Sequence, residues 1–149
     1  MRQSRAWTDD TGSASLEVVT VGMVMLVPLV YLVLAVSAVQ AGAFAVEGAA
    51  RQAARVFVQS PDLSAAEASA QRALDFALAD NQIATDGRMA VRCEPVPGEC
   101  FTRGGLVTVT VDLSVPLPLV PSVLVGDFPL AVPLHAAATE QVSRFWGSK

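Results

Sequence analysis

The longest hydrophobic segment of the chain runs from residue 18 to residue 46 and contains no charged side chain. As a helix it would extend about 43 Å, at about 1.5 Å per residue, whereas the hydrocarbon core of a bilayer is about 30 Å thick. Pro28 lies within it, and because membrane helices tolerate proline, we expect a local kink and not a break. The pattern therefore predicts a transmembrane helix that is tilted or protrudes from the membrane.

Polar residues follow this segment on its C-terminal side. Glu47, Arg51 and Arg55 recur at intervals of four, a favourable acid-before-base order on a solvated helix face. We therefore expect the first helix to continue past the membrane to about Phe57. Residues 59–62 then place a proline among polar residues, which predicts the end of the helix.

A second helix is predicted after this break. Ser64 and Glu67 match a capping box, and Leu63 is placed to act as a hydrophobic staple. Apolar residues at helical spacing then continue to about Asp80, and we expect them to cover a sheet. These residues are Ala66, Ala70, Leu74, Ala77 and Leu78.

Three segments of the C-terminal half have the pattern of β-strands. Residues 106–115 alternate between valine or leucine and polar residues, so one face is expected to be buried. Residues 88–93 and 130–142 have weaker patterns, and Pro133 places the latter segment at the edge of a sheet. We therefore expect an α+β fold, in which the second helix packs on a small antiparallel β-sheet of about three strands.

Two cysteines, Cys93 and Cys100, enclose a short segment that contains two prolines and a glycine. A disulfide bond is expected if this half of the chain is extracytoplasmic, and it would fix the register of the first two strands. The alternative is two free thiols beside a turn, because cysteine spacing alone does not set the compartment. Zinc normally requires four ligands, and His135 is the single histidine, so we expect no metal site.

Composition limits the class of protein. Apolar residues make up 52% of the 149 residues, and the mean hydropathy of +0.47 is high for a soluble domain. The length leaves room for one membrane span and one small head domain. The formal net charge is -4 and the 10 Lys and Arg residues are scattered, so we expect no nucleic-acid partner.

The sequence also lacks the motifs of a catalytic or cofactor site. His135 stands alone on a predicted edge strand, and the chain has no glycine-rich phosphate loop or metal-binding pair. We therefore predict that the protein is not an enzyme, needs no cofactor and has no small-molecule substrate.

Small residues form a stripe along one side of the long helix beyond Pro28. Ala38, Gly42 and Ala45 lie three or four residues apart, and such stripes let helices approach closely within lipid. We predict a helix-packing face at these residues. The alternative is a chance pattern, because alanine is common in this segment.

One proline-rich segment leaves two interpretations open. Residues 116–125 are apolar without a regular period, and their prolines exclude a central strand. The segment is either a loop whose leucines and valines pack on the head or a surface that rests on a membrane or on another protein chain.

Charge does not determine the orientation of the span. Arg2 and Arg5 precede it and Arg51 and Arg55 follow it, so the basic residues on the two sides are equal in number. A cleaved secretory signal peptide is an alternative, but the apolar segment is too long for that design and an acid stands at its entrance.

The most specific motif lies just before the span. Gly12 is followed by the sequence SASLE, which places Glu17 at the start of the apolar segment. This motif resembles the class III cleavage site of type IV pilin-like proteins, in which a membrane aspartic peptidase, the prepilin peptidase, cuts after the glycine. The glutamate then becomes the fifth residue of the mature chain. The resemblance implies a leader peptide at residues 1–12 and cleavage between Gly12 and Ser13.

Among these proteins the chain most resembles the TadE-like minor pilins, or pseudopilins, of tight-adherence (Flp) pilus systems. The cleavage motif, the alanine-rich segment 47–55 and a β-rich C-terminal region that includes AAATE at residues 136–140 carry this match. A major Flp pilin would be shorter and would usually have tyrosine after the glutamate, where this chain has Val18. The resemblance therefore implies a minor component of the pilus.

The resemblance also implies an organisation and a set of partners. After the leader, residues 13–58 would form the transmembrane and extended helix, and residues 59–149 an extracytoplasmic head. The N-terminus would be cytoplasmic, and the protein would lie in the cytoplasmic membrane or associate with the pilus. Its partners would be the prepilin peptidase, other pilin-like subunits and the pilus assembly platform.

Glu17 would act in assembly, by pairing with the new amino group of Ser13 or of a neighbouring subunit. The alternative is that Glu17 only marks the solvated end of the helix. The alternative function is a single-pass, membrane-anchored binding or sensor domain that is unrelated to pili.

Overall fold

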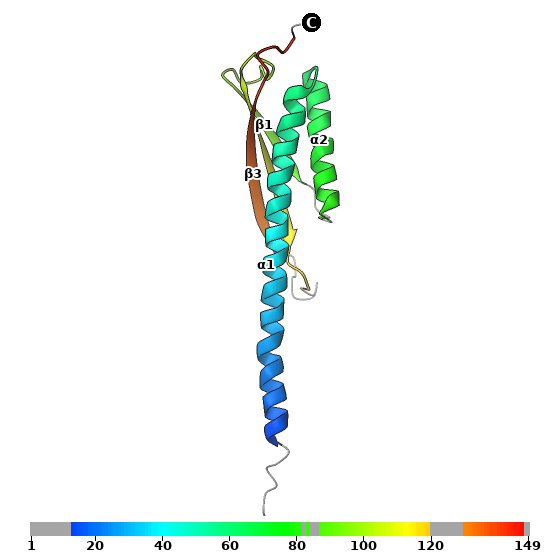
Figure 1. The fold of residues 1–149 in the computed structure, drawn as a ribbon, viewed down its shortest axis with the longest axis vertical. Coiled ribbons are helices and arrows are strands. Elements are labelled where there is room, and N and C mark those ends of the chain that lie inside the picture. The colour runs from blue at the N-terminus through cyan, green and yellow to red at the C-terminus, as the bar shows by residue number, and fades with distance from the viewer. Residues whose placement is uncertain (1–12, 82, 84–86, 120–129, 148–149) are drawn as a thin grey trace, which may run out of the picture. The chain divides into compact units, whose positions relative to one another are not determined.

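The computed structural model describes residues 13–81, 83, 87–119 and 130–147 of the chain. It contains two helices followed by an antiparallel sheet, so the predicted α+β fold with a long N-terminal helix is confirmed (Figure 1). The elements are α1 (Ser13–Gln59), α2 (Leu63–Asp80), β1 (Arg88–Glu94), β2 (Leu106–Pro116) and β3 (Ala131–Gln141).

Contacts divide the chain into two compact units, Met1–Val36 and Ser37–Lys149, which we call the N-terminal unit and the head unit. Helix α1 contributes to both units. The expected boundary of an extracytoplasmic head at residue 59 stays a prediction, whereas the head unit takes in α1 from Ser37 onward. The reason is that the C-terminal half of α1 carries buried residues of the head's core, such as Ala49 and Phe57.

Helix α1 ends where its sequence stops supporting helical hydrogen bonds. Pro28 lies inside the helix and does not end it. At the C-terminus, the Ser60 hydroxyl donates to the Val56 carbonyl at 2.8 Å, and the Ser60 amide donates to the Phe57 carbonyl at 3.2 Å. Pro61 follows directly and supplies no amide hydrogen to continue the ladder. The helix therefore ends at Gln59, close to the predicted end.

Helix α2 begins two residues earlier than the predicted capping box requires. Its N-cap is Asp62, whose carboxylate accepts hydrogen bonds from the Ala65 amide at 2.9 Å and from the Ser64 hydroxyl at 2.8 Å. The prediction of Ser64 as N-cap is therefore wrong, because Asp62 takes the cap position two residues earlier and accepts the Ala65 amide. Leu63 is the first helical residue and is exposed, so it does not act as a staple.

The Asp62 carboxyl group responds to this environment. The hydrogen bond from the Ala65 amide, followed by the one from the Ser64 hydroxyl, holds its pKa below the ordinary value. Both donors favour the charged form of the carboxyl group, as expected for an acid at the positive end of a helix.

The predicted apolar stripe of α2 faces the core. Ala66, Ala70, Leu74 and Leu78 are buried, and Ala77 at its margin is half-buried. Leu74 and Leu78 lie close against Gly87, directly before β1. The stripe therefore covers the start of the sheet, as the spacing predicts.

The sheet has the order β1-β2-β3, with both neighbouring pairs antiparallel. The buried positions of β2 are the predicted ones, Val107, Val109, Val111, Leu113 and Val115. Strand β3 contains Pro133 and lies at an edge, which confirms the prediction from that proline.

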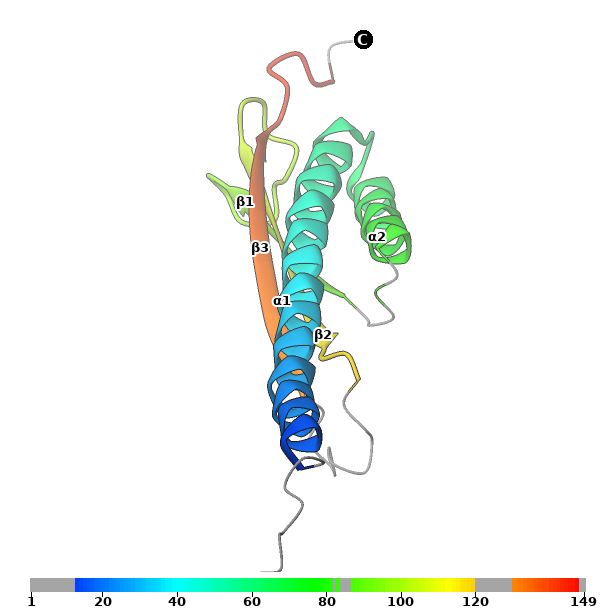
Figure 2. The same ribbon diagram turned by 60° about the horizontal axis from the view of Figure 1, so that its bottom comes forward.

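The buried core of the head unit joins both helices to one face of this sheet. In Figures 1 and 2, β3 and α2 lie on either side of the C-terminal half of α1. Most core residues that α1 contributes are alanines, which let its backbone come close to the strands. They are Ala45, Ala49, Ala50, Ala53 and Ala54.

Two glycines of α1 test this close approach. A Cβ atom at Gly42 would lie 2.5 Å from Val115 Cγ2 and 2.9 Å from Leu134 Cδ1, whereas one at Gly48 would meet nothing within 4 Å. Gly48→Ala should therefore stabilise the protein by about 1 kcal/mol, through helix propensity alone. Gly42→Ala should instead destabilise the protein, by about 1–3 kcal/mol, through overpacking against the sheet.

The measurement is the midpoint of chemical or thermal unfolding of both full-length variants in the same detergent. If Gly42→Ala raised the midpoint as much as Gly48→Ala does, the close contact between α1 and the sheet would be disproved.

Candidate membrane anchor and assembly site

The first turns of α1 place two predicted site residues near each other. The helix begins at Ser13, and Glu17 follows four residues later, about one turn along the axis. The Glu17 side chain is exposed. Gly12 and the rest of the predicted leader, residues 1–12, lie outside the described residues.

The N-terminal unit exposes an apolar helix surface in every direction. Among the described residues, one helix is long and apolar enough to cross a membrane, with a mean hydropathy of 2.6 over its most apolar stretch. None of that stretch is buried by the rest of the chain. Exposing such an apolar surface to water costs free energy, whereas contact with lipid tails does not. This is consistent with a single-pass membrane protein.

The exposed large apolar side chains of this segment are numerous. They are Leu16, Val18, Val19, Val21, Met23, Val24, Met25, Leu26, Val27, Leu29, Val30, Leu32, Val33, Leu34 and Val36. They are interrupted on the helix surface by Glu17, Thr20 and Gly22. The Thr20 hydroxyl donates to the Leu16 carbonyl at 2.7 Å, which satisfies it inside its own helix. Glu17 is therefore the charged group at the start of an otherwise apolar surface.

The predicted small-residue stripe has a partner within the chain. Gly42 and Ala45 are buried in the head unit, and Gly42 packs against Val115 and Leu134 of the sheet. We expected a neighbouring helix at these two positions, but the sheet of the same molecule lies against Gly42, and Ala45 is buried within the head unit. Ala38 is only half-buried, so a contact between Ala38 and another helix stays a prediction.

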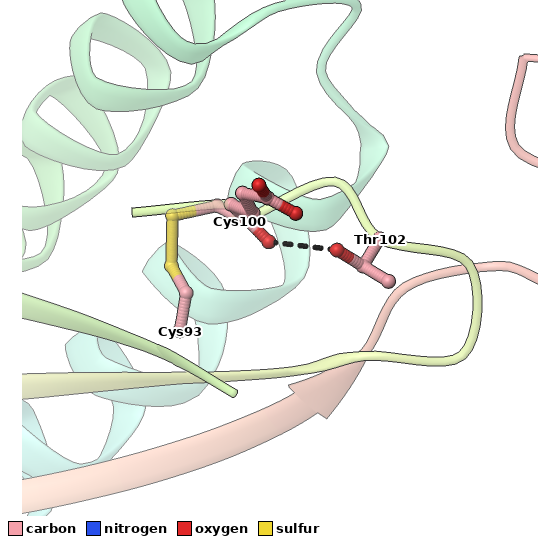
Figure 3. Close-up of a disulfide and its surroundings, with 4 residues drawn as sticks. Cys93, Cys100 and Thr102 are labelled. Atoms are coloured by element: carbon pink, nitrogen blue, oxygen red, sulfur yellow. Dashed lines mark hydrogen bonds between the residues drawn. A yellow bond between two sulfur atoms is a disulfide. The ribbon is translucent and has the colours of Figure 1, made fainter. Parts of the chain in front are cut away.

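Cys93 and Cys100 form a disulfide bond in the structure. Cys93 is buried at the end of β1, opposite Val107 of β2, and Cys100 lies in the connection between the two strands (Figure 3). The Thr102 hydroxyl donates to the Glu99 carbonyl at 3.1 Å beside the bridge. The bridge therefore closes the connection at the end of the sheet that is far from Gly42.

An aromatic stack at this far end was not predicted from the sequence. Phe101 stacks between Phe57 of α1 and Trp146 near the C-terminus, with ring centroids 5.9 and 4.9 Å apart. The Trp146 indole donates to the Ser60 carbonyl at 3.4 Å, and Arg103 donates to the Trp146 carbonyl at 3.1 Å. These rings come from three distant parts of the chain, so no local periodicity could have revealed the stack.

The outer face of the sheet carries a row of polar residues that sequence reasoning also missed. Strand register aligns Arg88, Asp112 and His135 side by side, one from each strand. All three are exposed and line a shallow depression with Ser114 and Pro133. His135, expected to stand alone on its strand, therefore has a carboxylate as its cross-strand neighbour. Within the described part of the chain, no hydrogen bond or ion pair joins the three side chains.

Among the described residues, no group of three histidine, cysteine or acidic side chains could hold a metal ion. Part of the proline-rich segment 116–125 is described, up to Leu119, and the remainder lies outside the described residues. The choice between a packed loop and an interacting surface therefore stays open for that remainder.

Comparison of the chain with protein-family models, curated proteins and solved structures found no match.

The disulfide generates a prediction about stability. A loop closed by a bond between residues seven apart in sequence should stabilise the native state by about 2–3 kcal/mol through the entropy of the unfolded chain. The double variant Cys93→Ser, Cys100→Ser should lose this stabilisation. Unfolding is measured for the variant and the native protein, each with and without reductant.

Reductant should lower the unfolding midpoint of the native protein and leave that of the double variant unchanged. If reductant had no effect on the native protein, the bond would contribute nothing to its stability.

Proposed function

We propose that the protein is a TadE-like minor pilin, or pseudopilin, that acts by subunit contacts in the assembly of a tight-adherence pilus. The observation that carries the proposal is the position of Glu17. It stands five residues after Gly12, at the start of a charge-free apolar helix that the structure leaves exposed. The coarser conclusion, a helix able to anchor the chain in a membrane, does not depend on this assignment.

The chemistry of the proposal begins with the removal of the leader. A glycine before the cleaved bond offers no side chain to obstruct the peptidase at the backbone. Cleavage after Gly12 would convert the amide nitrogen of Ser13 into an amino group, about one helical turn from Glu17. An unpaired charge in lipid costs about 2.5–3.5 kcal/mol on insertion scales, so the carboxylate and the new ammonium group have a strong reason to pair.

The same argument explains why the protein would work in an assembly. The partner of Glu17 could be its own N-terminus or that of a neighbouring subunit, and only the second pairing joins two chains. The exposed apolar surface of the N-terminal unit adds van der Waals contacts between neighbouring spans. In this proposal, other pilin-like subunits and the assembly platform are the partners, and the head lies outside the cytoplasm.

The first test concerns the processing of Gly12. Gly12→Leu should block removal of the leader, so that the processed fraction falls at least about tenfold, equivalent to about 1.4 kcal/mol in the barrier to cleavage. Intact-mass measurement and N-terminal sequencing from native cells provide the readout. The mature native protein should begin at Ser13.

A matched control is Gly22→Leu. A Cβ atom at Gly22 meets nothing within 4 Å, so this variant adds the same side chain to α1 away from the cleavage site and should be processed normally. Normal processing of Gly12→Leu would overturn the proposed cleavage. A native chain that begins at Met1 or Arg2 would favour the plain membrane anchor instead.

The second test concerns Glu17. Glu17→Ala should be processed normally but should co-purify with its partner subunits at least about tenfold less, because the amino group it pairs with is left unpaired in lipid. Glu47→Ala is the control, since Glu47 lies on the same helix in an exposed pair with Arg51 at 3.4 Å. Equal co-purification of the two variants would contradict the role of Glu17.

A further inference from the structure

An open groove of about 630 Å³ lies between α1 and α2 in the head unit. Val56 of α1 and Ala73 and Ala77 of α2 line it and are only half-buried. Phe76 also lines it and is 70% exposed. The groove residues of α2 differ from the buried stripe that covers the sheet. An exposed aromatic ring beside half-buried apolar side chains is typical of an interaction surface.

The two charged groups that flank Phe76 have different surroundings. Arg72 and Asp80 both line the groove, each about one helical turn, or about 6 Å, from Phe76. The Arg72 guanidinium donates to the Ala68 carbonyl and to the Ser69 hydroxyl, both at 3.2 Å, and so is held by its own helix. Within the described part of the chain, the Asp80 carboxylate makes no hydrogen bond or ion pair. The groove is therefore acidic at its Asp80 end.

The position of Asp80 in α2 strengthens this asymmetry. Asp80 is the last residue of the helix, where the backbone carries partial negative charge and a cation is favoured over an acid. Helix α2 as a whole has three acidic residues and one basic residue. We therefore expect the occupant of the groove to combine an apolar side chain with a neighbouring positive charge.

The segment after β3 carries this combination of residues. Phe145 is 81% exposed, the highest value among the exposed large apolar side chains of the described residues. Arg144 precedes it and is also exposed. Aromatic residues and arginine are both enriched at protein interfaces. The two residues together match the apolar and acidic character of the groove.

Hydrogen bonds and the aromatic stack hold this segment in place. The Trp146 ring stacks on Phe101 at 4.9 Å, and its indole donates to the Ser60 carbonyl at 3.4 Å. The Trp146 amide donates to the Ser143 carbonyl at 3.0 Å, and the Phe145 amide donates to the Ser143 hydroxyl at 3.2 Å. Phe145 is therefore presented on a fixed turn, which limits the entropy lost on binding.

We propose that the Arg144–Phe145 turn of one copy of the protein docks in the α1–α2 groove of a second copy. Phe145 then packs beside Phe76, over the small side chains of α2, and Arg144 pairs with Asp80. The turn does not fill the groove of its own chain, because Phe145 is exposed. All the residues of this contact belong to the head unit.

The two surfaces differ, so the contact is head-to-tail and not symmetric. A copy that binds through its turn still offers its groove to a further copy. Such contacts form rings or open chains and not closed two-fold dimers. The contact involves head residues alone, whereas the proposed function depends on Gly12 and Glu17, so the two are tested by different variants.

The test uses two full-length variants in detergent, each of which lacks one side of the contact. Phe145→Ala removes the ring of the turn and keeps the groove. Ala73→Arg fills the groove and keeps the turn. Analytical ultracentrifugation over a range of concentrations should show that each variant alone self-associates at least about tenfold more weakly than the native protein. An equal mixture of the two should form a one-to-one complex and nothing larger, because only one turn and one groove remain.

Charge reversal tests the pairing of Arg144 with Asp80. Arg144→Asp or Asp80→Arg alone should weaken self-association about threefold, as expected for an exposed ion pair. The two substitutions in the same chain should restore it. Failure of the double variant to recover would contradict the pairing.

Two further variants serve as matched controls. Phe44→Ala removes another exposed ring of the head unit, which is 74% exposed. Ala68→Arg places the same side chain as Ala73→Arg at an exposed position of α2 that does not line the groove. Both controls should self-associate as the native protein does.

Three outcomes would overturn the proposed contact. Native-like self-association of Phe145→Ala and of Ala73→Arg would assign it to other surfaces, such as the apolar helix of the N-terminal unit. Failure of the mixed variants to form a complex would exclude the pairing of turn with groove. A native protein that stays monomeric at every concentration would exclude a second copy as the occupant. None of these results would change the expected processing at Gly12 or the expected effect of Glu17→Ala.

Discussion

The close contact between α1 and the inner face of the sheet is the constraint on which the rest of the head unit depends. Gly42 allows the helix backbone to approach Val115 and Leu134, and the alanines that follow maintain that approach along the helix. Larger side chains at these positions would force the helix away from the strands. In α1, an apolar segment that suits lipid is thus followed directly by small residues that let the same helix pack on the sheet.

This double use explains why the apolar segment is longer than a membrane requires. Its later residues are apolar because the sheet buries them, and no separate core helix is needed. A head of this size has a small hydrophobic core and gains from additional constraints. The chain supplies two at the far end of the sheet, the Cys93–Cys100 bridge and the stack of Phe57, Phe101 and Trp146.

The aromatic stack connects parts of the chain that the secondary structure alone would leave free. Phe57 belongs to the last turns of α1, Phe101 to the strand connection that carries the bridge, and Trp146 to the segment after β3. Val142 is fully buried, and its amide and carbonyl bond to Gly105 and Gly104. The C-terminal segment is therefore part of the head's core, although it contains no regular element.

Local sequence patterns were sufficient to predict the helices and strands. They were not sufficient to predict contacts between residues that are distant in the sequence. The alternation in β2 and the stripe of α2 are direct consequences of one buried face, and Pro133 marks an edge because it lacks an amide hydrogen. The N-cap of α2 was misplaced because Asp62 and Ser64 both match cap preferences, and only the backbone geometry decides between them. The row of Arg88, Asp112 and His135 depends on strand register, which three separate segments do not reveal before they pair.

The stripe of small residues on α1 also shows what a local pattern cannot predict. Spacing at Gly42 and Ala45 correctly indicates that something packs closely against the helix, but spacing carries no information about what that partner is. A helix in lipid and a sheet in water both favour small residues at close contacts. The burial of these residues within the head unit removes them from the surfaces on which subunits could meet. Contacts between spans would therefore use residues of the N-terminal unit and the half-buried Ala38, and not Gly42 or Ala45.

Because Gly42 and Ala45 are buried, the proposed function depends more strongly on Glu17 for specific contacts between chains. The N-terminal unit offers neighbouring chains an apolar surface that is similar in all directions, so van der Waals packing alone would specify neither partner nor register. A single carboxylate changes this, because only arrangements that supply it with a cation avoid the cost of leaving it unpaired in lipid. Before cleavage the nitrogen of Ser13 is an uncharged amide, whereas afterwards it is an amine that can carry a positive charge. Removal of the leader would thus create the partner that Glu17 requires, and assembly would be confined to processed chains without any change in the head.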